Sequence, residues 1–153
     1  MKQTAQRYHD FSYGHRVSGH ESKCSNLHGH NGRAHFVCEA DDLDAVGRVI
    51  DFSAIKQRLC IWLEENWDHR FLAFNEDPII GAICRADYAG NPNCEALDVL
   101  DKSIVWVPFN PTAENMAAYL LNVIGPQQLA GTGVRLTSVT VEETRKCAAS
   151  ASL

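Results

Sequence analysis

The sequence predicts an α+β fold in which an antiparallel sheet is covered on one face by two helices. Three segments alternate apolar and polar residues with the period of a strand: Thr4 to Arg16, Gly32 to Ala40 and Val134 to Thr144. Two further segments, 51–66 and 112–124, carry apolar residues three and four positions apart, as an amphipathic helix does. Because strands and helices do not alternate regularly, we do not expect a parallel doubly wound sheet.

The first two predicted strands each have one apolar face, because side chains alternate across a strand. The inward-facing residues are Phe11, Tyr13 and His15 in the first strand and Ala34, Phe36, Cys38 and Ala40 in the second. After an acidic turn, Val49-Ile50 is expected to form a short hairpin return. We interpret Cys38, and Cys60 in the following helix, as small core residues.

The two predicted helices have recognisable ends. Asp51 or Ser53 can cap the first helix, which is expected to run to about Asn66, and Thr112 caps the second, which Gly125-Pro126 terminates. The apolar stripes consist of Phe52, Ile55, Leu59, Trp62 and Leu63 in the first helix and Met116, Leu120, Val123 and Ile124 in the second.

The remaining segments carry weaker patterns. From Asn75 to Lys102 we expect a long loop with one short helix, followed by a strand at Ile104 to Val107. In the last strand, Val134 to Thr144, Glu143 shares the apolar face and Glu142 faces the opposite way. The tail from Arg145 to Leu153 is expected to be frayed.

Composition limits the class of protein. A chain of 153 residues is enough for one domain, expected to span 1–153, and its 45% hydrophobic and 22% charged residues are typical of a soluble globular protein. The net charge of −5, without a basic cluster, argues against nucleic acid as a partner. The N-terminal residues lack the apolar core of a signal peptide, and no apolar run reaches the length of a membrane span. We therefore expect a cytoplasmic protein whose six cysteines are reduced thiols.

A metal site is predicted by the motif His28-Gly29-His30. In an extended strand both imidazoles point the same way, and His15 at the end of the first strand is the best third ligand, although His9 and His20 are not excluded. Three neutral imidazoles leave a fourth position open on zinc, which is typical of catalytic sites. Cys24 offers an alternative, because a thiolate as fourth ligand would make a closed structural site.

A second acid and imidazole favour the catalytic interpretation. Asp68-His69 would not be required by a structural zinc site. Cys24 as a thiolate is a suitable base near neutral pH, since a nearby cation lowers the pKa of a thiol. Glu143 on an apolar face needs a partner, which is either a ligand with N–H donors or a buried arginine.

These residues together resemble the 6-pyruvoyl tetrahydropterin synthase superfamily over about residues 8 to 145. The motifs that carry the resemblance are Phe11-Ser12-x-x-His15-Arg16, Cys24-x-x-x-His28-Gly29-His30-Asn31, Asp51-Phe52, Asp68-His69, Pro111-Thr112-x-Glu114-Asn115 and Val141-x-Glu143-Thr144. Three residues between the cysteine and the His-Gly-His motif are most similar to the queuosine-pathway branch, the 6-carboxy-5,6,7,8-tetrahydropterin synthases.

The resemblance implies a tunnelling fold in which trimers pair into a hexameric barrel with active sites at subunit interfaces. It implies a zinc ion on His15, His28 and His30, Cys24 as the base, and Asp68-His69 as its partner. It also implies that Glu143 binds the pterin ring. Thr112 and Glu114 are further candidates for substrate binding, although Glu114 also suits the first turn of a helix as a favourable charge.

The implied reaction converts 7,8-dihydroneopterin triphosphate to 6-carboxytetrahydropterin with loss of acetaldehyde and triphosphate. The alternatives are triphosphate elimination by a 6-pyruvoyl synthase and a zinc-binding module without catalysis. Arg16, Lys23 and Arg145 are the cations nearest the motifs and are candidates for binding the triphosphate. One departure from the family is Gly32, which stands where an aromatic residue often follows the His-Gly-His-Asn motif.

Overall fold

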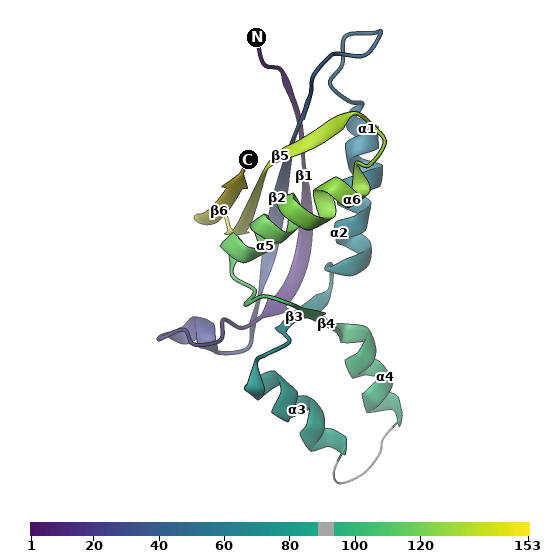
Figure 1. Cartoon of the computed structure of the whole chain (residues 1–153). Helices are drawn as coiled ribbons and strands as arrows, with labels where there is room; N and C mark the ends of the chain where they lie inside the picture. Colours follow the sequence, from purple (N-terminus) through teal and green to yellow (C-terminus); the bar gives the residue numbers. More distant parts are fainter. Residues whose placement is uncertain (89–93) are drawn as a thin grey trace.

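The computed structural model describes residues 1–88 and 94–153. Within them a curved six-stranded sheet has the order β4-β3-β1-β2-β5-β6 (Figure 1). Its strands are β1 (Thr4–His15), β2 (His28–Ala40), β3 (Arg70–Phe74), β4 (Ile104–Val107), β5 (Val134–Thr144) and β6 (Cys147–Ser152). The expected α+β class is confirmed, and so are the strands predicted from alternation.

The sheet is mixed, so the prediction of an entirely antiparallel sheet is wrong. β1 pairs with β2 and β2 with β5 in antiparallel fashion, but β3 lies parallel to both β1 and β4. The sequence did not predict β3, because this short strand is an almost continuous apolar run without alternation. A parallel pair requires a crossover of a dozen or more residues, and the segment between β3 and β4 provides it.

That crossover contains two helices, so the expectation of a long loop with one short helix is wrong. α3 (Pro78–Tyr88) and α4 (Cys94–Ser103) extend beyond the end of the sheet, away from the other helices (Figure 1). The part of the predicted loop between them, 89–93, lies outside the described residues. None of the helices in the described ranges is long and apolar enough to cross a membrane.

Two interrupted helices cover one face of the sheet, as predicted. The first consists of α1 (Phe52–Ile55), a π-helical turn at Lys56–Cys60 and α2 (Ile61–Asn66). The second consists of α5 (Ala113–Tyr119), a π-helical turn at Leu120–Ile124 and α6 (Gly125–Gln128). Asp51 accepts the N–H of Ser53 and Thr112 that of Asn115, which confirms both predicted caps.

The second helix does not end at Gly125-Pro126, as expected, but continues to Gln128. Pro126 lies at the start of α6, where a proline is tolerated. A Cβ atom on Gly125 would lie 2.7 Å from the Leu136 side chain, so the glycine permits close packing against β5 rather than ending the helix.

One hydrophobic core joins both helices to the inner face of the sheet. It includes most of the predicted inward residues of β1 and β2 and the predicted core cysteines Cys38 and Cys60, which are both fully buried. Phe52 is an exception in the predicted stripe, because it is 59% exposed at the first helical position and the buried stripe starts at Ile55.

Two predictions about irregular segments are also wrong. Val49-Ile50 forms no strand, because Asp44 organises the preceding loop by accepting the N–H groups of Val46 and Arg48. The C-terminal tail is not frayed, since β6 pairs with β5 in antiparallel fashion. Its run of alanine and serine has low strand propensity, so the tertiary pairing determines its conformation.

Candidate metal centre

The pairing of β1 with β2 places three histidines together at one end of the two strands. His15 lies directly opposite His28, and His30 lies opposite Tyr13. The three imidazoles form a group in which one ring nitrogen from each lies within 4.8 Å of the others. The structure thus brings His15, rather than His9 or His20, to the His28-Gly29-His30 motif.

The hydrogen bonds of two imidazoles fix their tautomers. His15 Nδ1 lies 2.7 Å from the carbonyl oxygen of Pro111, and His28 Nδ1 lies 2.7 Å from that of Asn26. A carbonyl can only accept, so both Nδ1 atoms carry the proton and both Nε2 atoms carry a lone pair. This backbone arrangement is how proteins orient metal-ligating histidines.

The lone pairs converge on a site that suits a cation. His15 Nε2 and His28 Nε2 are 3.1 Å apart, and the buried His30 Nε2 has no hydrogen-bond partner among the described residues. Two imidazole nitrogens on a tetrahedral zinc, with Zn–N distances of about 2.05 Å, are separated by about 3.3 Å. The three nitrogens therefore fit a metal ion, and a donor set of neutral imidazoles suits zinc.

Burial favours the neutral, metal-binding form of two of the imidazoles. His15 is fully buried, and this burial lowers its pKa to about 4. Burial also lowers the pKa of His30. Glu143 provides a negative charge beside them, with one carboxylate oxygen 3.8 Å from His15 Nε2 and the other 3.9 Å from His30 Nε2.

Cys24 is close to this centre but is not one of its grouped ligands. It follows the polar loop after β1, in the short 3-10 helix Lys23–Ser25. Together with His15, Thr112, Glu114 and Glu143 it lines a cavity of about 300 Å³. The predicted catalytic thiol and all three predicted substrate-binding residues thus share one cavity.

Asp68 and His69 are held together on the other flank of the site. Asp68 accepts the backbone N–H of Ser12 at 2.8 Å and pairs with His69 Nδ1 at 2.7 Å. Partial burial alone would raise the pKa of Asp68, but these two hydrogen bonds outweigh it and the pKa is lowered. His69 has a φ of 57°, an uncommon conformation outside glycine that often marks a functional residue.

A larger cavity, of about 630 Å³, contains the acid–imidazole pair. Asp68, His69, His30, Glu143 and Arg145 all contribute to its lining. Glu143 is therefore the predicted site residue that lines both cavities. A register shift in the β5–β6 pairing between Glu142 and Thr144 accompanies this position.

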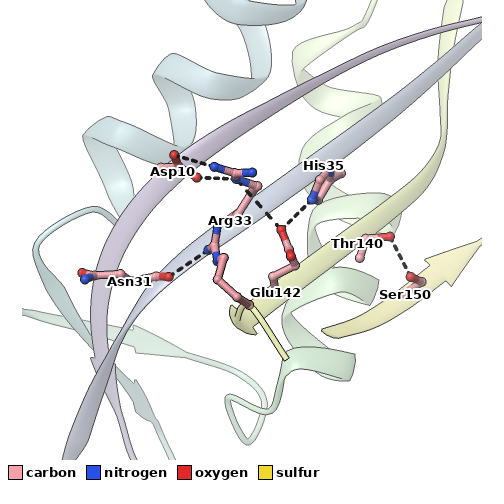
Figure 2. Close-up of polar contacts among 8 residues, drawn as sticks. Asp10, Asn31, Arg33, His35, Thr140, Glu142 and Ser150 are labelled. Carbon is pink, nitrogen blue, oxygen red and sulfur yellow. Dashed lines mark hydrogen bonds and ion pairs between the residues drawn. The ribbon is translucent and has the colours of Figure 1, made fainter. Parts of the chain in front are cut away.

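The opposite side chain, Glu142, belongs to a polar network on the outer face of the sheet (Figure 2). Its carboxylate lies 2.8 Å from His35 Nε2 and 4.0 Å from Arg33, which also pairs with Asp10. Three neighbouring strands, β1, β2 and β5, are thus tied together beside the larger cavity. In the same region Arg145 donates a hydrogen bond of 3.2 Å to the carbonyl oxygen of Asn31.

Sequence reasoning missed the backbone groups that orient the site and the contacts of the Tyr13 ring with His15 and His30. The carbonyls of Pro111 and Asn26 carry no side-chain signal. Tyr13, in contrast, could have been found, because alternation places its side chain on the same strand face as His15.

Comparisons with known proteins agree with this geometry. The family model for 6-pyruvoyl tetrahydropterin synthase matches residues 4–152. The chain belongs to this family. Among curated relatives, the 6-carboxy-5,6,7,8-tetrahydropterin synthase of Rickettsia typhi is 35% identical over 138 residues, which cover 90% of this chain and 91% of the relative. A protein of the same name from Haemophilus influenzae is 28% identical, over 82% of this chain and 85% of the relative.

These relatives confirm the similarity to 6-carboxy-5,6,7,8-tetrahydropterin synthases, and the protein is an enzyme of this family of lyases. Among solved structures, an uncharacterized protein from Wolinella succinogenes superposes with a TM-score of 0.84 at 27% identity, covering 99% of this chain and 98% of its own. The Caenorhabditis elegans 6-pyruvoyl tetrahydropterin synthase superposes with a TM-score of 0.66 at 21% identity, over 100% and 96% of the two chains, and so supports the fold.

Proposed function

We propose that the protein converts 7,8-dihydroneopterin triphosphate to 6-carboxy-5,6,7,8-tetrahydropterin, releasing acetaldehyde and triphosphate, as a step toward queuosine. Atom balance requires that one water molecule be consumed. The observation that carries the proposal is the group of three imidazoles, one of them fully buried, whose ring nitrogens converge, flanked by Cys24 and by Asp68-His69. The names of the curated relatives support the same reaction.

In this proposal His15, His28 and His30 hold a zinc ion, which polarises the oxygens of the substrate side chain and acidifies the adjacent C–H bonds. Cys24 removes a proton from carbon as a thiolate. Its place in the smaller cavity beside His15 and Glu143 supports this role.

His69 delivers or accepts the second proton, with Asp68 fixing the tautomer of its ring. The 2.7 Å contact of Nδ1 with Asp68 leaves Nε2 free for proton transfer. Glu143 accepts N–H groups of the pterin, and Thr112 and Glu114 line the end of the site near Cys24. The Thr112 side chain also caps α5, so its position is well determined.

Cys24 and Asp68-His69 line different cavities. We propose that they act together within a homo-oligomer, a hexamer built from trimers. An open sheet leaves two edge strands, β4 and β6, whose backbone groups can pair with another copy.

The proposal is tested by incubating the zinc-loaded protein with 7,8-dihydroneopterin triphosphate and identifying the product by mass. A carboxylated pterin with acetaldehyde supports it. A pyruvoyl product would assign the enzyme to triphosphate elimination, the activity for which the Caenorhabditis elegans structural relative is named.

The Cys24→Ala variant is expected to keep zinc but to lose about 10²–10⁴-fold in turnover, because it removes the general base. Metal content by mass spectrometry and steady-state kinetics check this. Cys147→Ala is the matched control, since Cys147 lines the same cavity without a proposed role. Full turnover in Cys24→Ala would show that another group removes the proton.

Arg145 is the best candidate for binding the triphosphate. Arg16 is not available, because its guanidinium pairs with the buried Asp77 at 2.6 Å. Arg145 lines the larger cavity and makes no ion pair within the part of the chain that the structure describes. A guanidinium matches phosphate oxygens in geometry and charge.

We expect Arg145→Ala to raise KM for the triphosphate substrate about 10- to 100-fold, with little change in kcat, because it removes a charge-assisted hydrogen bond. Initial rates over a range of substrate concentrations measure this. Arg135→Ala is the control, since Arg135 lies on β5, the strand that precedes Arg145, and pairs with Asp41 away from the cavity. An equal rise in KM for both variants would show that the effect arises from the loss of one positive charge on the protein as a whole.

A further inference from the structure

Tyr13 is a buried tyrosine whose hydroxyl group has no hydrogen-bond partner among the residues that the structure describes. The residue is 3% exposed. A buried hydroxyl without a partner costs free energy, and such groups in folded proteins call for an explanation. Phenylalanine would fill the same place without that cost.

The Tyr13 ring cannot rotate to bring its hydroxyl to a hydrogen-bond partner, because other side chains enclose the ring on several sides. It stacks on Phe11 at 5.0 Å between centroids and meets the rings of His15 and His30 at 5.1 and 5.6 Å. On the neighbouring strand it lies against Gly32, where an added Cβ would be 2.8 Å from the Tyr13 ring. Gly32 is therefore glycine because the Tyr13 ring occupies the space of a side chain.

Glu143 is a charged side chain that faces both of the imidazoles against which the Tyr13 ring packs. A phenol carries its proton near neutral pH, so the Tyr13 hydroxyl is a hydrogen-bond donor. Glu143 now points both oxygens toward His15 and His30, at 3.8 and 3.9 Å. A metal ion on those imidazole nitrogens would attract the Glu143 carboxylate, unless another donor holds that carboxylate away from it.

We propose that Tyr13 is a positioning residue, whose hydroxyl donates a hydrogen bond to the Glu143 carboxylate in the metal-loaded protein. This contact keeps Glu143 turned away from the metal and available to the N–H donors of a ligand. The inference rests on the proposed function, because it concerns the carboxylate assigned to the pterin. It also gives a partner to a buried hydroxyl that has none among the described residues.

The test is a double-mutant cycle of Tyr13→Phe and Glu143→Ala on thermal unfolding, measured with and without saturating zinc and without any pterin. With zinc, Tyr13→Phe is expected to lower Tm by about 2–4 °C when Glu143 is present and not when it is alanine. Without zinc, Tyr13→Phe should not lower Tm in either background, since the hydroxyl then has no partner to lose.

Tyr8→Phe is the matched control, because Tyr8 lies on the same strand and is 52% exposed. It removes a hydroxyl without changing Tm in either metal state. A loss of stability in Tyr13→Phe that is equal in both Glu143 backgrounds would overturn the proposal, as would the absence of any zinc-dependent effect. Either result would reduce Tyr13 to a packing residue.

A binding measurement separates this inference from the proposed function. Calorimetry with neopterin on the zinc-loaded protein is expected to give about tenfold weaker binding for Tyr13→Phe than for the wild type. If the wild type does not bind neopterin, the assignment of a pterin substrate is contradicted, while the unfolding cycle still decides the role of Tyr13. If neopterin binds equally well to both proteins, the positioning role is overturned and the pterin assignment stands.

Discussion

The His30→Ala variant is expected to lose zinc and all measurable lyase activity. His30 contributes one of three imidazole nitrogens, and its buried Nε2 atom makes no hydrogen bond in the described ranges 1–88 and 94–153. Loss of a partner that merely orients a ligand lowers metal affinity 10- to 100-fold, so loss of a ligand should lower it by more than about 100-fold. Competition with a chromophoric chelator measures the affinity.

This variant is preferable to changes at His15 or His28, because those residues also donate hydrogen bonds to backbone carbonyls. We expect His30→Ala to leave the metal-free protein about as stable as the wild type. His35→Ala is the matched control, since His35 lies on the same strand but faces the outer network with Glu142 (Figure 2). Unchanged zinc affinity in His30→Ala would exclude the three-histidine site.

Much of this site could be predicted from the sequence, because strand alternation is a strong local rule. The alternation of β1 placed His15 on the buried face, and the one-residue gap in His28-Gly29-His30 placed two imidazoles on a common face. What alternation cannot provide is the register between the strands. It is the pairing of His15 with His28 that distinguishes His15 from His9, whose ring lies 3.6 Å from Glu64 instead.

The errors in the predicted fold have a common physical origin in long-range pairing. β3 and β6 have weak strand patterns of their own and are strands because β1 and β5 offer them backbone partners. The parallel arrangement of β3 and β4 follows from the α3–α4 crossover. The start of α3 could have been predicted, because Asp77 accepts the N–H of Ile79 as a cap and Pro78 occupies the first helical position. The helices on the sheet were predicted well, since caps and apolar stripes are local signals.

The Arg16→Met variant is expected to be about 3–5 kcal/mol less stable than the wild type. The role of Arg16 in stability is apparent only from the tertiary structure. The Arg16 side chain is 11% exposed and that of Asp77 is 1% exposed. One guanidinium nitrogen lies 2.6 Å from both Asp77 oxygens, and Nε donates to the carbonyl oxygen of Ser25. Arg16→Met would leave a buried carboxylate whose side chain keeps, within the described residues, the N–H of Ile79 as its hydrogen-bond partner.

Urea unfolding of Arg16→Met and of the double variant Arg16→Met/Asp77→Asn tests this account. The double variant should recover a large part of the stability, because the cost arises from the unpaired charge rather than from the lost attraction. Arg135→Met, which breaks an exposed pair with Asp41, should have no measurable effect. A double variant as unstable as Arg16→Met would instead attribute the loss to the packing of the arginine side chain.

The Arg16–Asp77 ion pair is also expected to affect catalysis, and this effect can be separated from its effect on stability. Arg16 holds the carbonyl of Ser25, and Cys24 precedes Ser25, so the pair connects the start of α3 to the loop that carries the proposed base. In the double variant, where the charge cost is relieved, we expect stability to recover further than turnover does. The Cys24 thiol would then lie on a loop that has lost the Arg16 hydrogen bond to Ser25, while the bond from the Val17 N–H to the Cys24 carbonyl and the two bonds between Ser18 and Asn110 remain.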